Sequence, residues 1–181
     1  VNAGTMQLQN GAAISNTAGP VSVANLATLQ LLNSETISSY VGADDGANEN
    51  DSLLALGGNT LTTTGSASIA NVTSANGSLV AGTSIVDNDT DVNVTGTGVF
   101  LQAGASVGTL ANPLETAVAN LEGTAGTGYF VASTTDVNLG GVTAAAGVSA
   151  TGGDIVISAA GAMTVSENVT ATGAGTDITL T

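Results

Sequence analysis

The residues best suited to chemistry in this chain are aspartates. Asp87, Asp89 and Asp91 occupy alternate positions in the stretch VDNDTDVN, like the first ligands of an EF-hand calcium loop. Such a loop continues with glycine at position six and glutamate at position twelve, where this chain has Val92 and Gly98. The run therefore predicts either a calcium site of another kind or a turn in which aspartates bond their own backbone.

A second acidic group occurs in the stretch GADDGANEND. Its members are Asp44, Asp45, Glu49 and Asp51, and carboxylates of this kind can chelate calcium across neighbouring repeats. Asp44 and Asp45 are also the candidates for a glycosidase, which needs two carboxyl groups. Since the chain has no basic residue to hold a sugar, we expect no hydrolase activity.

The composition excludes most other chemistry. The chain of 181 residues has 14 acidic side chains and no lysine, arginine, histidine or cysteine. Zinc sites, base-assisted nucleophiles and phosphate-binding lysines are thereby ruled out, and the uniform negative charge disfavours nucleic acid. No segment approaches the roughly 18 apolar residues of a membrane helix. We predict no enzyme, no membrane insertion and no cofactor, with calcium as the one alternative.

These acidic groups must be positioned by a repeat. The heptapeptide LQNGAAI at 8–14 returns as LQAGASV at 101–107, and related copies follow at steps of about 22–30 residues. Each copy begins with an aliphatic residue, and we expect these residues to form one core ladder. The ladder is Leu8, Leu31, Leu56, Leu79, Leu101, Val131, Ile157 and Leu180.

Short alternating runs lie between the copies, such as VSV at 21–23 and IVI at 155–157. Alternation with β-branched residues predicts strands, and runs this short are stable only when stacked coil on coil. The sequence therefore predicts an all-β chain that is one β-solenoid segment, 1–181, with about seven to eight coils of 22–30 residues. A β-sandwich with coincidental spacing is the alternative.

One stretch interrupts the pattern, ANPLETAVANLEG at 111–123. Asn112 is a good helix N-cap and Pro113 suits the first helical position. The apolar face of such a helix holds Leu114, Val118 and Leu121. We therefore predict a short helical insertion near 112–121, which serves either as a recognition knob or as a loop that covers a gap in a sheet.

The phrases GGDIVISAAGAMTV (152–165) and ANPLETAVANLEG, with degenerate coils rich in Gly, Ala, Thr, Val and Asn, resemble the repeat shafts of filamentous-haemagglutinin-like and autotransporter adhesins. The resemblance implies a right-handed parallel β-helix that is secreted to a bacterial cell surface. Such shafts normally carry some lysine and arginine, and this chain carries none.

Three functions follow as hypotheses. The first is a structural or adhesive, non-catalytic shaft or fibre protein that is extracellular or on the cell surface. Its partners would be neighbouring copies or flanking repeats stacked end to end, because solenoid ends are open sheet edges, with a host or matrix surface as a further partner. The second is a calcium-dependent extracellular binding module. The third is a β-helix carbohydrate-active enzyme.

Overall fold

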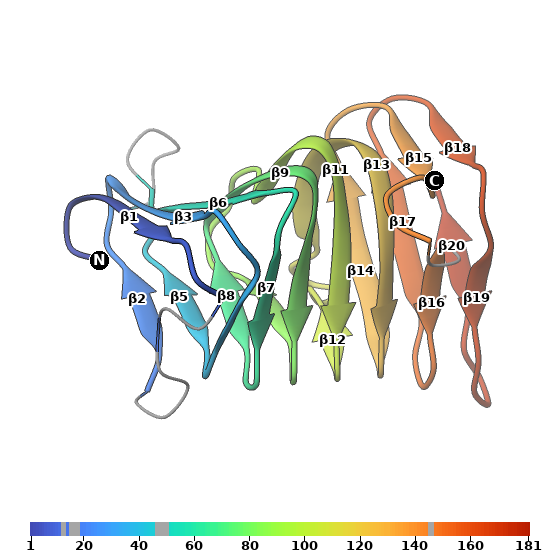
Figure 1. Cartoon of the computed structure of the whole chain (residues 1–181). Helices are drawn as coiled ribbons and strands as arrows, with labels where there is room; N and C mark the ends of the chain where they lie inside the picture. The colour runs from blue at the N-terminus through green and yellow to red at the C-terminus, as the bar shows by residue number, and fades with distance from the viewer. Residues whose placement is uncertain (12–13, 15–18, 46–50, 145–146) are drawn as a thin grey trace.

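The computed structural model describes residues 1–11, 14, 19–45, 51–144 and 147–181. Within these residues the chain forms 20 strands and no helix. Neighbouring strands pair in parallel, and the coils stack into a β-solenoid of about seven turns. The N-terminus lies at one end of the stack and β18–β20 lie at the other (Figure 1). The prediction of an all-β solenoid is confirmed.

Three runs of stacked strands make up the walls, which we name faces A, B and C. Face A contains the strands that open each coil: β2 (Val21–Val23), β5 (Tyr40–Gly42), β8 (Ala67–Ile69), β10 (Ile85–Asp87), β12 (Ser106–Val107), the starts of β14 (Gly128–Ser133) and β17 (Ile155–Ala159), and β20 (Ile178–Leu180). Face B follows in each coil: β1 (Gly4–Leu8), β3 (Ala27–Leu31), β6 (Leu53–Gly57), the starts of β9 (Asn71–Ala81), β11 (Val94–Ala103) and β13 (Leu114–Ala125), and the ends of β14 and β17.

Face C closes each coil. It contains β4 (Glu35–Ile37), β7 (Thr60–Thr63), the ends of β9, β11 and β13, then β16 (Val148–Ala150) and β19 (Val169–Ala171). Two short strands, β15 (Val137–Leu139) and β18 (Met163–Val165), stack on the middle of β13 between faces B and C.

Alternation decides which side chains enter the core. In β3, Ala27, Leu29 and Leu31 are buried while the residues between them are half-buried, as a period of two requires. Outward side chains stack as well: the Gln7 side-chain amide donates to Gln30 Oε1 at 2.8 Å. Strand β3 is therefore stabilised by an apolar column inside and by a polar pair outside.

The core is aliphatic except for two fully buried tyrosines, Tyr40 and Tyr129. The Tyr129 ring occupies space that a missing side chain leaves: a Cβ placed on Gly123 would lie 2.7 Å from the tyrosine hydroxyl oxygen. Gly123 stacks on Leu101 in face C. The glycine interrupts the leucine column so that a tyrosine from face A can fill the same layer.

The predicted ladder of eight aliphatic residues is buried at its first seven positions, but it is wrong as one column. Its members fall into three columns on different parts of the wall. The observed pairs are Leu8 with Leu31 on face B, Leu79 with Leu101 on face C, and Val131 with Ile157 and Ile157 with Leu180 where the wall passes from face A to face B.

The reason is that coil length varies. Leu79 stacks on Leu61 of the coil before it, not on Leu56. The coil between Ala67 and Ile85 is short, and the one between Tyr40 and Ala67 is long. A constant step of about 23 residues therefore drifts from one face to the next.

The predicted helical insertion near 112–121 is wrong as well. Leu114–Ala125 form the single long strand β13, in register with β11 from Val94–Thr116 to Ala103–Ala125. Asn112 does not cap a helix: its backbone N–H donates to Thr109 Oγ1 at 3.0 Å and closes a tight turn. Leu114 and Val118 lie on the same face in a strand as well as in a helix. The neighbouring coil supplies hydrogen-bond partners along the whole extended backbone, and these partners favour the strand.

The corner between faces A and B differs from coil to coil. Residues 43–52 separate β5 from β6, and residues 88–93 separate β10 from β11. The coil between them turns at Ala70 alone, since β8 ends at Ile69 and β9 begins at Asn71. Longer corner segments therefore flank a short one, and six of the 14 acidic residues of the chain lie in these two longer segments.

Candidate metal centre

The structure brings the two predicted acidic groups to one corner. Asn88 Nδ2 donates a hydrogen bond of 2.8 Å to the carbonyl of Gly42, although a whole coil lies between these residues. We call this cluster the acidic corner. It contains seven of the 14 acidic side chains: Asp44, Asp45, Asp51, Asp87, Asp89, Asp91 and Glu115. Glu49, the remaining predicted ligand, lies outside the described residues.

A buried asparagine organises the inner part of the corner. Asn93 Nδ2 lies 2.8 Å from Asp87 Oδ1 and 2.8 Å from Asp89 Oδ1, and Asn93 Oδ1 accepts from the Glu115 backbone N–H at 2.8 Å. The Asn93 side chain is fully buried. One amide thus fixes two carboxylates and joins their turn to the next coil.

Backbone amides satisfy the same two oxygens. The Asp89 N–H donates to Asp87 Oδ1 at 2.9 Å, and the Asp91 N–H donates to Asp89 Oδ1 at 3.2 Å. These are the turns that the aspartate-rich sequence predicts. The turns leave one oxygen on each buried carboxylate, and Asp87 Oδ2, Asp89 Oδ2 and Glu115 Oε2 have no hydrogen-bond partner among the described residues.

The outer part of the corner holds three carboxylates. One oxygen from each of Asp44, Asp45 and Asp51 lies within 4.8 Å of the other two. The Asp45 N–H donates to Asp51 Oδ1 at 3.3 Å. Asp45 is exposed, whereas Asp44 and Asp51 are half-buried. This spacing suits three oxygen ligands around one cation.

Burial and repulsion from neighbouring charges raise the pKa values of Asp51, Asp89 and Glu115. The pKa of Asp89 rises to about 7, chiefly through burial and then through the negative charges of Asp87 and Asp51. Burial likewise raises the pKa of Glu115, with further contributions from Asp87 and Asp91. The chain has no lysine, arginine or histidine to oppose these charges. At neutral pH the corner therefore favours a proton or a bound cation.

Sequence reasoning missed Asn88, Asn93 and Glu115. A signal for the last two was present, because the pair Asn-Val at 71–72 returns at 93–94. The structure continues this step: Val94 pairs with Val72 and with Thr116. An alignment of corners, not of aliphatic heptapeptides, would have placed Asn93 beside Glu115.

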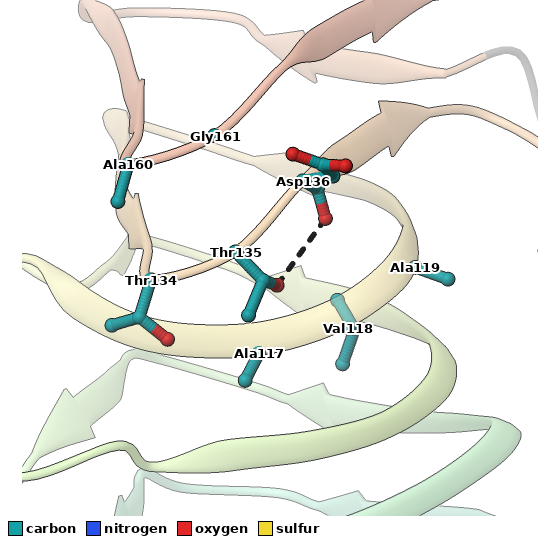
Figure 2. Close-up of a pocket in the computed structure, with 8 residues that line it drawn as sticks. All are labelled: Ala117, Val118, Ala119, Thr134, Thr135, Asp136, Ala160 and Gly161. Carbon is teal, nitrogen blue, oxygen red and sulfur yellow. Dashed lines mark hydrogen bonds between the residues drawn. The ribbon is translucent and has the colours of Figure 1, made fainter.

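A separate hollow on the wall lacks such chemistry. It is a shallow groove of about 460 Å³, and three successive coils line it with small side chains (Figure 2). Asp136 is its one ionisable lining residue, and its Oδ1 accepts from the Ala162 N–H at 2.7 Å. A glycosidase needs two carboxyl groups, and Asp44 and Asp45 do not line this groove.

Comparisons with known proteins give no indication of the function of this chain. No protein-family model matches this chain, and no match was found among curated proteins or solved structures. In the part of the chain that the structure describes, we find no helix with the length and apolar character needed to cross a bilayer. Function must be inferred from the geometry of this chain itself.

Proposed function

We propose that this chain is a structural, non-catalytic rod segment: the shaft of an extracellular or cell-surface fibre of a bacterium. The observation that carries the proposal is the parallel stack of about seven coils on one apolar core. At about 4.8 Å per layer the stack is about 35 Å long. Its length grows with every coil added, which suits a spacer better than a binding pocket.

The last strands leave apolar side chains exposed. Ile178 and Leu180 of β20 are 44% and 36% exposed, although they stack on Ile155 and Ile157, which are fully buried. Val165 of β18, the last strand of the stack on β15, is 49% exposed. A further parallel coil, from flanking repeats or from a neighbouring copy, would bury these side chains in the same way.

The resemblance to filamentous-haemagglutinin-like and autotransporter adhesins supports the cell-surface setting. Those shafts are degenerate parallel coils, and the coils of this chain have the same style of repeat. A host or matrix surface is the further partner that such a shaft would contact. The side walls suit this role, because stacked polar residues such as Gln7 and Gln30 cover them.

The experiment compares two double variants. Ile178→Lys with Leu180→Lys places charge on the terminal layer. Val41→Lys with Val86→Lys makes the same change at outward positions of face A, where the side chains are 38% and 42% exposed. We expect the wild type and the wall variant to form rods that lengthen with concentration in sedimentation and electron microscopy, in steps of about 35 Å. The terminal variant is expected to stay short.

The proposal would be contradicted by compact particles of constant size at every concentration. It would also be contradicted if the terminal and wall variants behaved alike, since growth would then not use the end of the core. A polysaccharide screen provides a separate check on the non-catalytic part of the proposal, and sugar release would overturn it.

A further inference from the structure

We propose that the acidic corner is a calcium site, with Asp44, Asp45 and Asp51 as direct ligands and the unpartnered oxygen of Asp89 reaching the ion through a water molecule from the inside. The ion would tie the segment after β5 to the segment after β10, across the coil formed by β8 and β9. The inference goes beyond the proposed shaft function, because it concerns the wall of the solenoid and holds for a rod of any length.

The first observation is the pair of buried carboxylates. Asp87 is 6% exposed and Asp89 is 9% exposed, and each has one buried oxygen without a partner among the described residues. Burying a carboxylate is costly unless its oxygens are paired or coordinate a metal. Asn93 turns one oxygen of each carboxylate toward itself. The second oxygen of each is left for another ligand.

The second observation is the outer trio. A calcium ion binds oxygens at about 2.3–2.6 Å, so two ligands on the same ion lie no more than about 5 Å apart. The oxygens of Asp44, Asp45 and Asp51 satisfy this limit, since all lie within 4.8 Å of one another. They form a three-sided arrangement that is open to further ligands, as a site of six to eight oxygens requires.

The two observations meet at Asp51. Its charge acts on Asp89, and the charge of Asp91 acts on Asp51 in turn. The Asn88 hydrogen bond to Gly42 holds the two segments together on the same side of the coil between them. The inner carboxylates and the outer trio therefore lie near enough for their charges to interact, although the sequence places them in separate groups.

The donor chemistry selects the ion. Every candidate ligand is a carboxylate or amide oxygen, and the chain has no cysteine or histidine for zinc or copper. Flexible carboxylate-rich sites suit calcium, whereas magnesium demands near-ideal octahedral geometry and keeps most of its water. A dication would also lower the repulsion among carboxylates that no side chain of this protein neutralises.

The experiment begins with the wild-type chain stripped of metal by a chelator and returned to chelator-free buffer. Calcium chloride is titrated in by calorimetry, and Tm is followed by far-ultraviolet circular dichroism. We expect one saturable calcium per chain and a rise in Tm of several degrees at saturation. The wild-type titration tests the proposal whether or not any variant folds.

Two variants then test the ligands. Asp51→Asn and Asp89→Asn keep shape and remove one charge each. Each is expected to raise Tm in chelator, because repulsion falls, and to weaken calcium binding at least tenfold, because a ligand charge is lost. The opposite signs distinguish a ligand from a residue that simply supports the fold.

Asp177→Asn is the matched control, because it makes the same charge change at an exposed position beside β20. Its calcium affinity is expected to stay within about twofold of the wild type. The proposal is overturned by no saturable binding up to about 10 mM calcium, above the range of weak extracellular modules. It is also overturned if magnesium, or sodium chloride at equal ionic strength, gives the same rise in Tm, or if Asp177→Asn weakens binding as much as Asp51→Asn does.

Discussion

Two groups of buried carboxylates in this solenoid differ in whether their oxygens have hydrogen-bond partners. The Glu122 carboxylate, fully buried in β13, accepts hydrogen bonds from the Val142 N–H at 2.7 Å and from the Thr143 N–H and hydroxyl at 3.0 and 2.6 Å. Asp87 and Asp89 are nearly as buried, yet each has an unpartnered oxygen. Burial of an acid alone therefore indicates no ligand.

The difference comes from what surrounds each acid. The Glu122 side chain crosses from one coil to the next and meets a turn whose donors point at it. In the acidic corner, donors reach only one oxygen of Asp89, and the charges that act on it are those of other carboxylates. The Glu122 carboxylate supplies hydrogen-bond acceptors to a turn whose backbone N–H groups have no strand partner. The acidic corner instead gathers negative charges that only a bound proton or cation neutralises.

The largest effect is expected from removing the hydrogen-bonded carboxylate of Glu122. Glu122→Ala removes the buried acceptor of three hydrogen bonds from Val142 and Thr143, so we expect a loss of about 2–3 kcal/mol in unfolding free energy. Urea denaturation measures it, with and without calcium. The loss should be the same in both conditions, and a calcium-dependent loss would show that the two sites are not independent.

The next largest effect is expected from removing the side chain of Asn93, which holds Asp87 and Asp89 in the acidic corner. Asn93→Ala deprives Asp87 and Asp89 of a shared donor and Glu115 of an acceptor for its N–H. We expect a loss of about 2 kcal/mol in chelator and weaker calcium binding by calorimetry. If calcium affinity is unchanged, Asn93 does not orient the ligands.

A pH titration of the metal-free protein gives an effect of about 2 kcal/mol. The folded pKa of Asp89 is about 7, above its usual value of 3.8, because of burial and of Asp87 and Asp51. This contribution is therefore fully present below about pH 4 and is lost as the pH rises through 7. Urea midpoints from pH 4 to 8 measure it.

The Asp89→Asn variant is the control for that titration. Since asparagine does not ionise, its midpoints should change less across the same range. The other carboxylates of the corner, including Asp87 and Asp51 whose charges act on Asp89, remain in the variant. Equal pH dependence in both proteins would assign the effect to those groups instead.

The smallest effect concerns the exposed ligand. Asp45→Asn changes an exposed side chain, so stability in chelator should move by less than about 0.5 kcal/mol. Calcium affinity should fall by about threefold, since water replaces an exposed ligand more readily than a buried one. A loss as large as that of Asp89→Asn would place the ion farther out than we propose.

Local pattern was sufficient for some of these features. The alternation in β3 and the aliphatic positions Leu8 to Ile157 are visible in the sequence, and the structure buries them. The stretch at 111–123 was ambiguous, because Leu114 and Val118 share a face in a strand as well as in a helix. The partners that decided in favour of a strand belong to β11, which no local pattern reveals.

The candidate site shows the same limit. The acidic runs around Asp44 and Asp87 were recognisable as oxygen ligands from residue type alone. Their meeting was not, because it requires the intervening coil to turn at Ala70 without an insertion. The hydrogen bond from Asn88 to Gly42 records that meeting.

The sequence by itself determined that this protein is a stack of short strands on an aliphatic core, and that its charged side chains are all acidic. Only the tertiary structure decided which residue lies above which, and therefore where the acids gather. The physical reason is that side-chain alternation is a local property of each strand, whereas register depends on corner length. Corners accept insertions at little cost in free energy, so equal steps along the sequence need not lead to equivalent positions on the wall.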